Sequence, residues 1–276
     1  MGIGKTIRWV KTEWALVAQG SAMSNAERGR WLRQWVPFGA RTVGYGTLSL
    51  LAGPMTPDHR ASAWAARRWS QASARGIGIR IESSGLDHVP LGPCVYMSNH
   101  QSLLDVLVLG AVLPGDFRWA AKRSLMNIPF LGWHLRLAGH VPVDRGGGKE
   151  AAGVVVERFV RTLGASKALL VFPEGTRSED GEIKSFKEGG FRAAVLAGAP
   201  VVPVAIEGTY RLMGKHAADT GPIADRERRL VRVRVGEPIP APSDGTEQER
   251  VDALRERARQ TIVAMHAELR RLATAS

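Results

Sequence analysis

The chain has 276 residues, 44% of them hydrophobic, which is enough to bury the core of one domain with a small appendage. Its formal net charge is +12 and its pI is near 10.6, which indicates an anionic partner: nucleic acid, a negatively charged membrane surface or an acidic substrate. The single cysteine, Cys94, excludes an intrachain disulfide, and no group of residues has the spacing of a metal site.

Most of the positive charge lies towards the N-terminus. Residues 1–80 contain twelve Lys and Arg against three Asp and Glu, and six of the eight tryptophans fall in the first 70 residues. We expect amphipathic helices over residues 5–19, from about residue 25, and over residues 58–74, because Trp and Arg lie beside apolar residues there. This pattern suits the headgroup zone of a bilayer, and the alternative is an ordinary basic helical hairpin that covers the core. The sequence therefore predicts a membrane-association module over residues 1–76.

The longest uncharged run in this module covers residues 42–57, sixteen residues with three glycines and two prolines. Because about 20 mostly apolar residues are needed to span a bilayer, we expect this run to insert part-way or to pack on the domain. Charged residues from Lys5 onward interrupt any signal-peptide core. We therefore expect a peripheral or monotopic protein on the cytoplasmic face of the membrane.

Strands and helices alternate over residues 77–276, which we predict to form an α/β domain. The expected strands are 77–83, 93–98, 117–121, 139–143, 167–172, 201–206 and 229–236, and the expected helices are 103–112, 129–137, 148–163, 188–198 and 246–272. This order predicts a mixed, largely parallel sheet flanked by helices. The polar stretch over residues 209–228 is interpreted as a surface loop, with a lid as the alternative.

Polar residues with catalytic potential follow the expected strand at 93–98. His100 and Asp105 are five residues apart, so neither a continuous helix nor a continuous strand brings their side chains together. A strand, a turn at His100 and a helix that begins near Leu103 can do so. The carboxylate then accepts a hydrogen bond from one imidazole N–H and leaves the other ring nitrogen as a base. The alternative is a capping box, because Asp105 also stands three residues after Ser102.

A second polar stretch, residues 172–178, follows the strand-like run at 168–172 and reads Phe-Pro-Glu-Gly-Thr-Arg-Ser. With both stretches, the sequence resembles the glycerolipid acyltransferase family, which contains the 1-acylglycerol-3-phosphate O-acyltransferases. Four blocks carry the resemblance, in the family's order: Asn99, His100 and Asp105 (N-H-x4-D); Lys122, Pro129, Gly132, Asp144 and Arg145; residues 172–178 without a departure; and Val202, Pro203 and Val204. Together they cover residues 93–208, somewhat under half of the chain.

The resemblance implies roles for these residues. His100 is the expected general base and Asp105 its orienter, while the binding residues are Lys122, Arg145, Glu174, Gly175, Thr176 and Arg177. Lys122 and Arg177 are expected to contact a substrate phosphate, Glu174 to accept from a glycerol hydroxyl, and Gly175 to let the backbone approach closely. Two simpler interpretations stay open: a turn closed by a Glu174–Arg177 pair, and a surface ion pair between Asp144 and Arg145.

The function that this resemblance implies is transfer of a fatty acyl group from acyl-CoA or acyl carrier protein to the sn-2 hydroxyl of lysophosphatidic acid. The expected partners are those substrates and an anionic membrane surface, with no cofactor besides the acyl donor. Acylation of another lysolipid, such as a lyso-ornithine lipid or a lysophospholipid, is the first alternative. A serine lipid hydrolase that uses Ser98 or Ser102 is a more remote one. Nucleic acid is not expected, because no groove-reading motif accompanies the basic charge.

Overall fold

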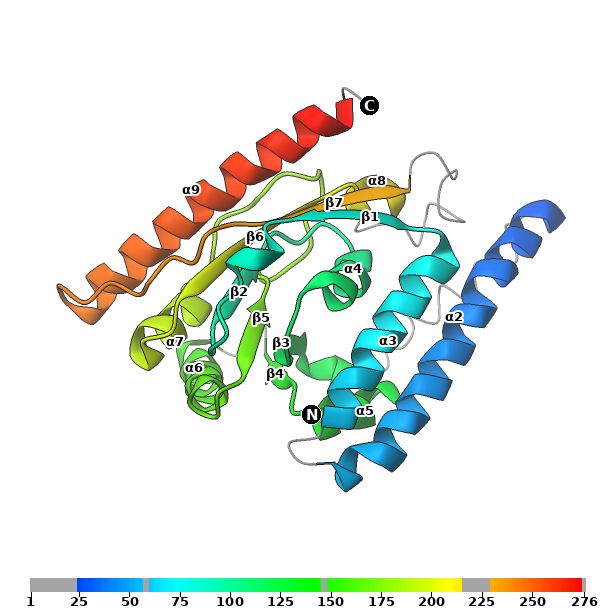
Figure 1. Ribbon diagram of the computed structural model, residues 1–276, viewed down its shortest axis with the longest axis horizontal. Helices are drawn as coiled ribbons and strands as arrows, with labels where there is room; N and C mark the ends of the chain where they lie inside the picture. The colour runs from blue at the N-terminus through cyan, green and yellow to red at the C-terminus, as the bar shows by residue number, and fades with distance from the viewer. Residues whose placement is uncertain (1–23, 57–59, 145–147, 215–228, 275–276) are drawn as a thin grey trace.

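The computed structural model describes residues 24–56, 60–144, 148–214 and 229–274. They form one seven-stranded sheet with helices on both faces (Figure 1). The strands are β1 (Arg80–Ser84), β2 (Val95–Ser98), β3 (Phe117–Lys122), β4 (Val141–Val143), β5 (Ala168–Val171), β6 (Val201–Glu207) and β7 (Leu230–Val235). Each predicted strand is present, and the α/β class with a mixed, largely parallel sheet is confirmed.

The strand order is β1-β7-β6-β2-β5-β3-β4. Every neighbouring pair is parallel except β6 and β7, which run antiparallel with Val204 opposite Val235. The carboxyl ends of β2, β5, β3 and β6 therefore meet at one edge of the sheet. Ligand sites of open α/β sheets gather at this edge, and both polar stretches begin there.

The helices are α2 (Asn25–Ala52), α3 (Arg60–Ile77), α4 (Leu104–Val112), α5 (Leu131–Leu137), α6 (Gly148–Gly164), α7 (Gly189–Ala197), α8 (Thr209–Leu212) and α9 (Glu247–Thr274). The expected helix at 5–19 lies outside the described residues. The interpretation of residues 209–228 as a loop is wrong at its start, where α8 follows Gly208, and residues 215–228 are not described.

Alternating side chains of the central strands build two separate cores. Val95 and Met97 of β2 face α6, α7 and α9, while Cys94 and Tyr96 face the side of α3 and α4. β5 alternates in the same way, with Leu169 on the first side and Leu170 on the second. The period of two is the expected behaviour of a strand that is buried on both faces. In Figure 1, α6, α7 and α9 lie on one side of the sheet, and α2, α3 and α4 on the other.

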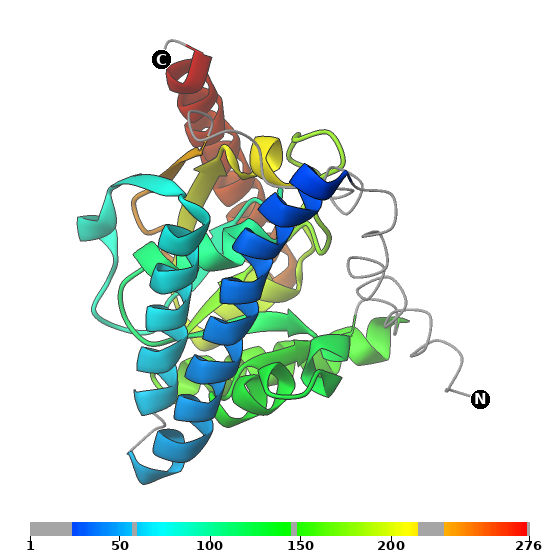
Figure 2. The same ribbon diagram turned by 90° about the vertical axis from the view of Figure 1, so that its right-hand side faces the viewer.

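The N-terminal helices α2 and α3 run side by side and pack over α4 and α5 (Figure 2). The uncharged run from residue 42 continues α2 to Ala52 and ends in a 3₁₀ turn over Gly53–Met55. Its packing on α3 is specific: Trp69 donates from Nε1 to Thr42 Oγ1 at 3.0 Å, and Ser62 donates to the carbonyl of Ser49 at 3.4 Å. None of the described helices has the length and apolarity needed to cross a bilayer.

Candidate active site

The side chains of His100 and Asp105 meet across the turn between β2 and α4. His100 Nδ1 lies 2.8 Å from Asp105 Oδ2, and the side chains are 7% and 0% exposed. Since an ionised carboxylate only accepts hydrogen bonds, Nδ1 carries the proton and donates it. Nε2 then holds a lone pair, and no described residue hydrogen-bonds to it. Such an imidazole can accept a proton from an incoming hydroxyl.

Asp105 also caps the start of α4. Its Oδ2 accepts from the backbone N–H of Gln101 at 2.7 Å and of Ser102 at 2.9 Å, in addition to the imidazole. This one oxygen therefore makes both the hydrogen bonds of a helix cap and the hydrogen bond to the imidazole. Its other oxygen, Oδ1, is buried and has no hydrogen-bond partner among the described residues.

The second polar stretch, residues 172–178, wraps around the backbone of His100. The Phe172 ring stacks on the imidazole, with centroids 3.9 Å apart and an angle of 12° between the planes. The His100 N–H donates to Glu174 Oε1 at 2.8 Å, and the His100 carbonyl accepts from the Ser178 N–H at 2.8 Å. The turns after β2 and β5, far apart in the sequence, thus form one unit around the imidazole.

Glu174 is a buried carboxyl with both oxygens engaged. Its Oε2 accepts from the Lys184 N–H at 3.0 Å, while Oε1 holds His100. Burial raises the pKa of Glu174 to about 7, against the lowering effect of the two backbone N–H donors. The structure therefore links Glu174 to the backbone of His100 and Lys184, and no Glu174–Arg177 pair is needed to explain its position in this turn.

Gly175, Thr176 and Arg177 form the outer part of the same turn. Gly175 has a φ of +72°, a left-handed conformation that favours glycine, while the nearest atom to an added Cβ is Cε of the flexible Lys187 side chain, which can move aside. Thr176 and Arg177 are half-buried. Arg177 directly precedes Ser178, whose N–H bonds His100, so its backbone lies beside the candidate base.

Lys122, another predicted binding residue, lies further along the same edge of the sheet. Lys122 is the last residue of β3, which β5 separates from β2. Arg145 lies outside the described residues. Asp144 pairs with Arg123 at 3.0 Å, and both side chains are about half exposed, so this pair is a surface ion pair with a different arginine from the one expected.

Neither candidate serine of the hydrolase alternative contacts the imidazole. Ser98 Oγ donates to the carbonyl of Asn99 at 3.1 Å, and Ser102 Oγ donates to the carbonyl of Met213 at 2.5 Å. Ser102 Oγ also accepts from the Leu104 N–H at 3.1 Å, in keeping with a cap. The geometry therefore gives no support to a Ser-His-Asp triad.

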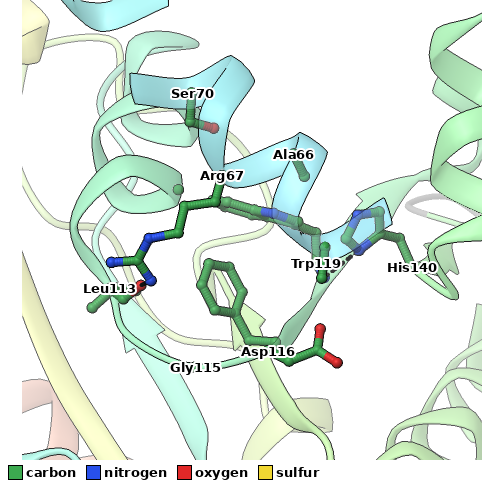
Figure 3. Close-up of a pocket in the computed structure, with 11 residues that line it drawn as sticks. Ala66, Arg67, Ser70, Leu113, Gly115, Asp116, Trp119 and His140 are labelled. Carbon is green, nitrogen blue, oxygen red and sulfur yellow. Dashed lines mark hydrogen bonds between the residues drawn. The ribbon is translucent and has the colours of Figure 1, made fainter. Parts of the chain in front are cut away.

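A small cavity lies near the opposite end of the sheet from this site. It measures about 30 Å³, room for roughly one water molecule, and is lined by α3, α4 and β3. Figure 3 shows Arg67 reaching towards the Leu113 carbonyl, at 3.0 Å, and His140 bonded to the Trp119 N–H, also at 3.0 Å. His100 is not among the lining residues, so this cavity is separate from the candidate base.

Sequence reasoning gave no structural role to several residues that hold the site, although Asn99 was already part of the first family block. Asn99 clamps the turn to β6, since its amide donates to the Ile206 carbonyl and accepts from the Ile206 N–H, both at 2.9 Å. Gln101 contacts His266 of α9 at 2.8 Å. Asn99 and Gln101 flank the histidine and were within reach of a sequence argument, whereas nothing in the sequence points to His266.

Comparison with known proteins agrees with the geometry. A family model described as Acyltransferase matches residues 80–207. The 1-acyl-sn-glycerol-3-phosphate acyltransferase of Pseudomonas aeruginosa is 32% identical over 187 residues, which cover 66% of this chain and 72% of the relative. The human 1-acyl-sn-glycerol-3-phosphate acyltransferase alpha is 35% identical over 197 residues, covering 70% of this chain and 65% of the relative.

The fold has a counterpart among solved structures. The crystal structure of the 1-acyl-sn-glycerophosphate (LPA) acyltransferase PlsC from Thermotoga maritima superposes with a TM-score of 0.73. The match covers 87% of this chain and 95% of that one, at 24% identity. With the relatives above, these findings show that the chain belongs to the acyltransferase family that contains the 1-acyl-sn-glycerol-3-phosphate acyltransferases.

Proposed function

We propose that the protein transfers a fatty acyl group from acyl-CoA or acyl carrier protein to the sn-2 hydroxyl of lysophosphatidic acid, giving phosphatidic acid. The observation that carries this proposal is the buried His100–Asp105 pair, 2.8 Å apart, at the carboxyl edge of the sheet. The names of the relatives supply the substrate class.

The chemistry follows from that pair. His100 Nε2 takes the proton of the acceptor hydroxyl while its oxygen attacks the thioester carbonyl. The tetrahedral intermediate collapses, the C–S bond breaks, and the departing thiolate takes the proton from the imidazolium. Asp105 stabilises the imidazolium in between. Because a thiolate leaves readily, no covalent acyl-enzyme is required.

The binding residues form the second part of the proposal. Lys122 and Arg177 are proposed to hold the acceptor phosphate, Arg177 with a bidentate fork and Lys122 as a point charge, while Arg145 is kept as a secondary binding residue. Gly175 and Thr176 shape the turn on which Arg177 stands. Glu174 already accepts one backbone N–H on each oxygen, so a glycerol hydroxyl would use a remaining lone pair.

The membrane surface is the proposed location. Exposed apolar side chains lie along α2, at the turn after it and on α5: Leu32, Val36, Val43, Leu48, Leu51, Met55, Phe130 and Trp133. α2 and α5 are in contact, and the Phe130 side chain lies against Gly46. Exposed apolar side chains on a basic protein suit an anionic bilayer. We propose that residues 1–76 form the membrane-association module and that the protein is peripheral or monotopic on the cytoplasmic face.

The test is a matrix of acyl donors and lysolipid acceptors, assayed on purified protein with anionic vesicles. We expect lysophosphatidic acid to be the best acceptor and His100→Ala to lower kcat by about 100- to 10,000-fold, the usual contribution of a general base. His88→Ala is the matched control, since His88 lies in a 3₁₀ turn and bonds the Val235 carbonyl instead.

Wild-type turnover by His100→Ala would rule out the mechanism. Preference for a lyso-ornithine lipid or another lysophospholipid would replace the acceptor and leave the mechanism intact.

A further inference from the structure

A second buried imidazole–carboxylate pair lies between α9 and the carboxyl end of β6, next to the turn that carries His100. His266 of α9 places Nε2 at 2.8 Å from Glu207 Oε2, at the carboxyl end of β6, and the side chains are 5% and 8% exposed. Glu207 also accepts from Arg211 of α8 at 2.9 Å, and Arg270 of α9 approaches it at 3.9 Å. Buried charges are costly unless they are well paired, and Glu207 is paired here with both His266 and Arg211.

The imidazole of His266 contacts the turn that carries the candidate base. The side-chain amide of Gln101 lies 2.8 Å from His266 Nε2, and it donates to the Gly181 carbonyl at 3.1 Å. One ring nitrogen of His266 therefore lies within hydrogen-bond distance of both Glu207 and Gln101, and it accepts from the Gln101 amide in the tautomer that carries its proton on Nδ1. Gln101 is 2% exposed, so its side chain is enclosed by these contacts.

Gln101 in turn holds Asp105. Its backbone N–H donates to Asp105 Oδ2 at 2.7 Å, the same oxygen that accepts the His100 imidazole. Gly181, the other partner of the Gln101 amide, donates its N–H to Ser178 Oγ at 3.0 Å, and Ser178 bonds the His100 carbonyl. Both routes from Gln101 end at His100, one through the carboxylate and one through the backbone.

We propose that His266 is a positioning residue for acyl transfer: by holding the Gln101 side chain against Gly181, it fixes the backbone N–H that keeps Asp105 aligned with His100. The proposal rests on the proposed role of His100 and Asp105. A misplacement of about 1 Å at a reacting group can lower a rate by roughly 100-fold, so a residue one step removed from the pair can control turnover.

The variants are His266→Ala, His266→Gln and Gln101→Ala, with Ile262→Ala as the matched control. Ile262 lies one turn earlier on α9, is fully buried and packs in the core instead of on Gln101. Glutamine is the conservative replacement, because its amide oxygen can accept from the Gln101 amide nitrogen in the place of His266 Nε2. Each protein is measured for kcat, KM, thermal unfolding, and the proton NMR signal of the His100 Nδ1–H, which is assigned by its loss in His100→Ala.

We expect His266→Ala and Gln101→Ala each to lower kcat by about 10- to 100-fold with little change in KM, and the double variant to be no worse than either. The His100 Nδ1–H signal should broaden or exchange faster with water in both. His266→Gln should recover most of the turnover. Ile262→Ala should lower the unfolding temperature but leave the signal and kcat unchanged.

A purely structural role for His266 predicts a different result: a lower unfolding temperature with an unchanged Nδ1–H signal and kcat, as in the control, and this would overturn the inference. If His266→Ala does not fold, Gln101→Ala decides the matter by the same criteria. If His100→Ala proves fully active, the proposed mechanism fails, while the NMR signal still reports whether His266 orders the His100–Asp105 pair.

Discussion

His100 is held on every side by contacts that leave a single ring nitrogen available. Asp105 fixes its tautomer, Phe172 stacks on its face, and Glu174 and Ser178 bond its backbone. A base held in this way loses little entropy on reaching the transition state. The unpaired oxygen of Asp105 makes it possible to separate charge from geometry at this pair.

Asp105→Asn is the variant that does so. The amide can place its oxygen where Oδ2 lies, keeping all three hydrogen bonds, and its nitrogen where the unpaired Oδ1 lies. Only the negative charge that stabilises the imidazolium is lost. We expect kcat to fall by about 100-fold, within the usual range for general-base catalysis, while the unfolding temperature stays within a few degrees. A fully active Asp105→Asn protein would show that the carboxylate charge has no role in turnover.

Glu174 gives the fold a pH dependence. Its pKa is raised by burial to about 7 from an ordinary 4.5, so between these values the folded protein keeps a proton that the unfolded chain releases. Stability from this group is therefore complete below pH 4.5 and is lost as the pH rises to 7. Relative to Glu174→Gln, the wild-type protein should lose up to about 3 kcal/mol of unfolding free energy over this interval, measured by denaturant titration. A stability difference that does not change with pH would contradict this assignment.

Among single residues, the sequence predicted those site residues that directly follow a strand in the chain. His100 and Asp105, and the block that contains Glu174 and Arg177, follow strand ends that are visible as apolar runs. The contact between Gln101 and His266 joins residues 165 apart in the sequence, and no periodicity reports such a pairing. Burial of Glu174 by both turns was likewise unpredictable, because it depends on how β2 and β5 pair.

At the scale of elements, apolar periodicity predicted each strand but not all of the boundaries. The first strand begins at Arg80 instead of residue 77, because Ile77 completes α3 and Gly78, at a φ of +82°, reverses the chain. The antiparallel pairing of β7 with β6 could not be specified in advance, since strand direction follows from pairing rather than from side-chain pattern.

Gly132, part of the second family block, shows how one element depends on a missing side chain. A Cβ at this position of α5 would lie 2.0 Å from the backbone oxygen of Met126, so α5 or the preceding 3₁₀ turn over Arg123–Asn127 must shift. We expect Gly132→Ala to lower the unfolding free energy by about 1–3 kcal/mol, as overpacking does. Denaturant titration provides the measurement.

Gly44→Ala is the control for this substitution. Gly44 lies within α2 with nothing within 4 Å of its ideal Cβ, so alanine should stabilise the helix by about 1 kcal/mol. If the two substitutions change the unfolding free energy equally, the close approach of a Cβ at position 132 to the Met126 oxygen does not destabilise the fold.

At the scale of the whole molecule, net charge and exposed apolar surface act together. The charge of +12 favours approach to an anionic bilayer, and salt weakens that attraction, whereas burial of apolar side chains does not depend on salt in this way. Composition predicted the basic character. Which apolar residues of α2 stay exposed could not be read from the sequence, because α3 and α5 cover only part of that helix.

Vesicle binding tests this arrangement. Wild-type protein should co-sediment with anionic vesicles and be partly released by high salt. Val36→Asp and Leu51→Asp should each weaken binding by about tenfold, since burying one such side chain contributes about 1.5–3 kcal/mol. Leu91→Asp is the matched control, because Leu91 is fully exposed but lies in the connection between β1 and β2. Equal loss in all three variants would argue against α2 as the binding surface.

The pairing of β1 with β7 has a consequence for biosynthesis. Glu82 and Arg232, 150 residues apart, are direct neighbours in these two strands. During translation, β1 leaves the ribosome long before β7, its partner among the described strands, exists, and β6 likewise has one side open until β7 emerges. Unpaired strand edges invite association with other chains. A nascent chain that stalls before residue 230 therefore exposes the unpaired edges of β1 and β6 at the same time. To avoid aggregation, it depends on rapid elongation or on a chaperone that covers these edges.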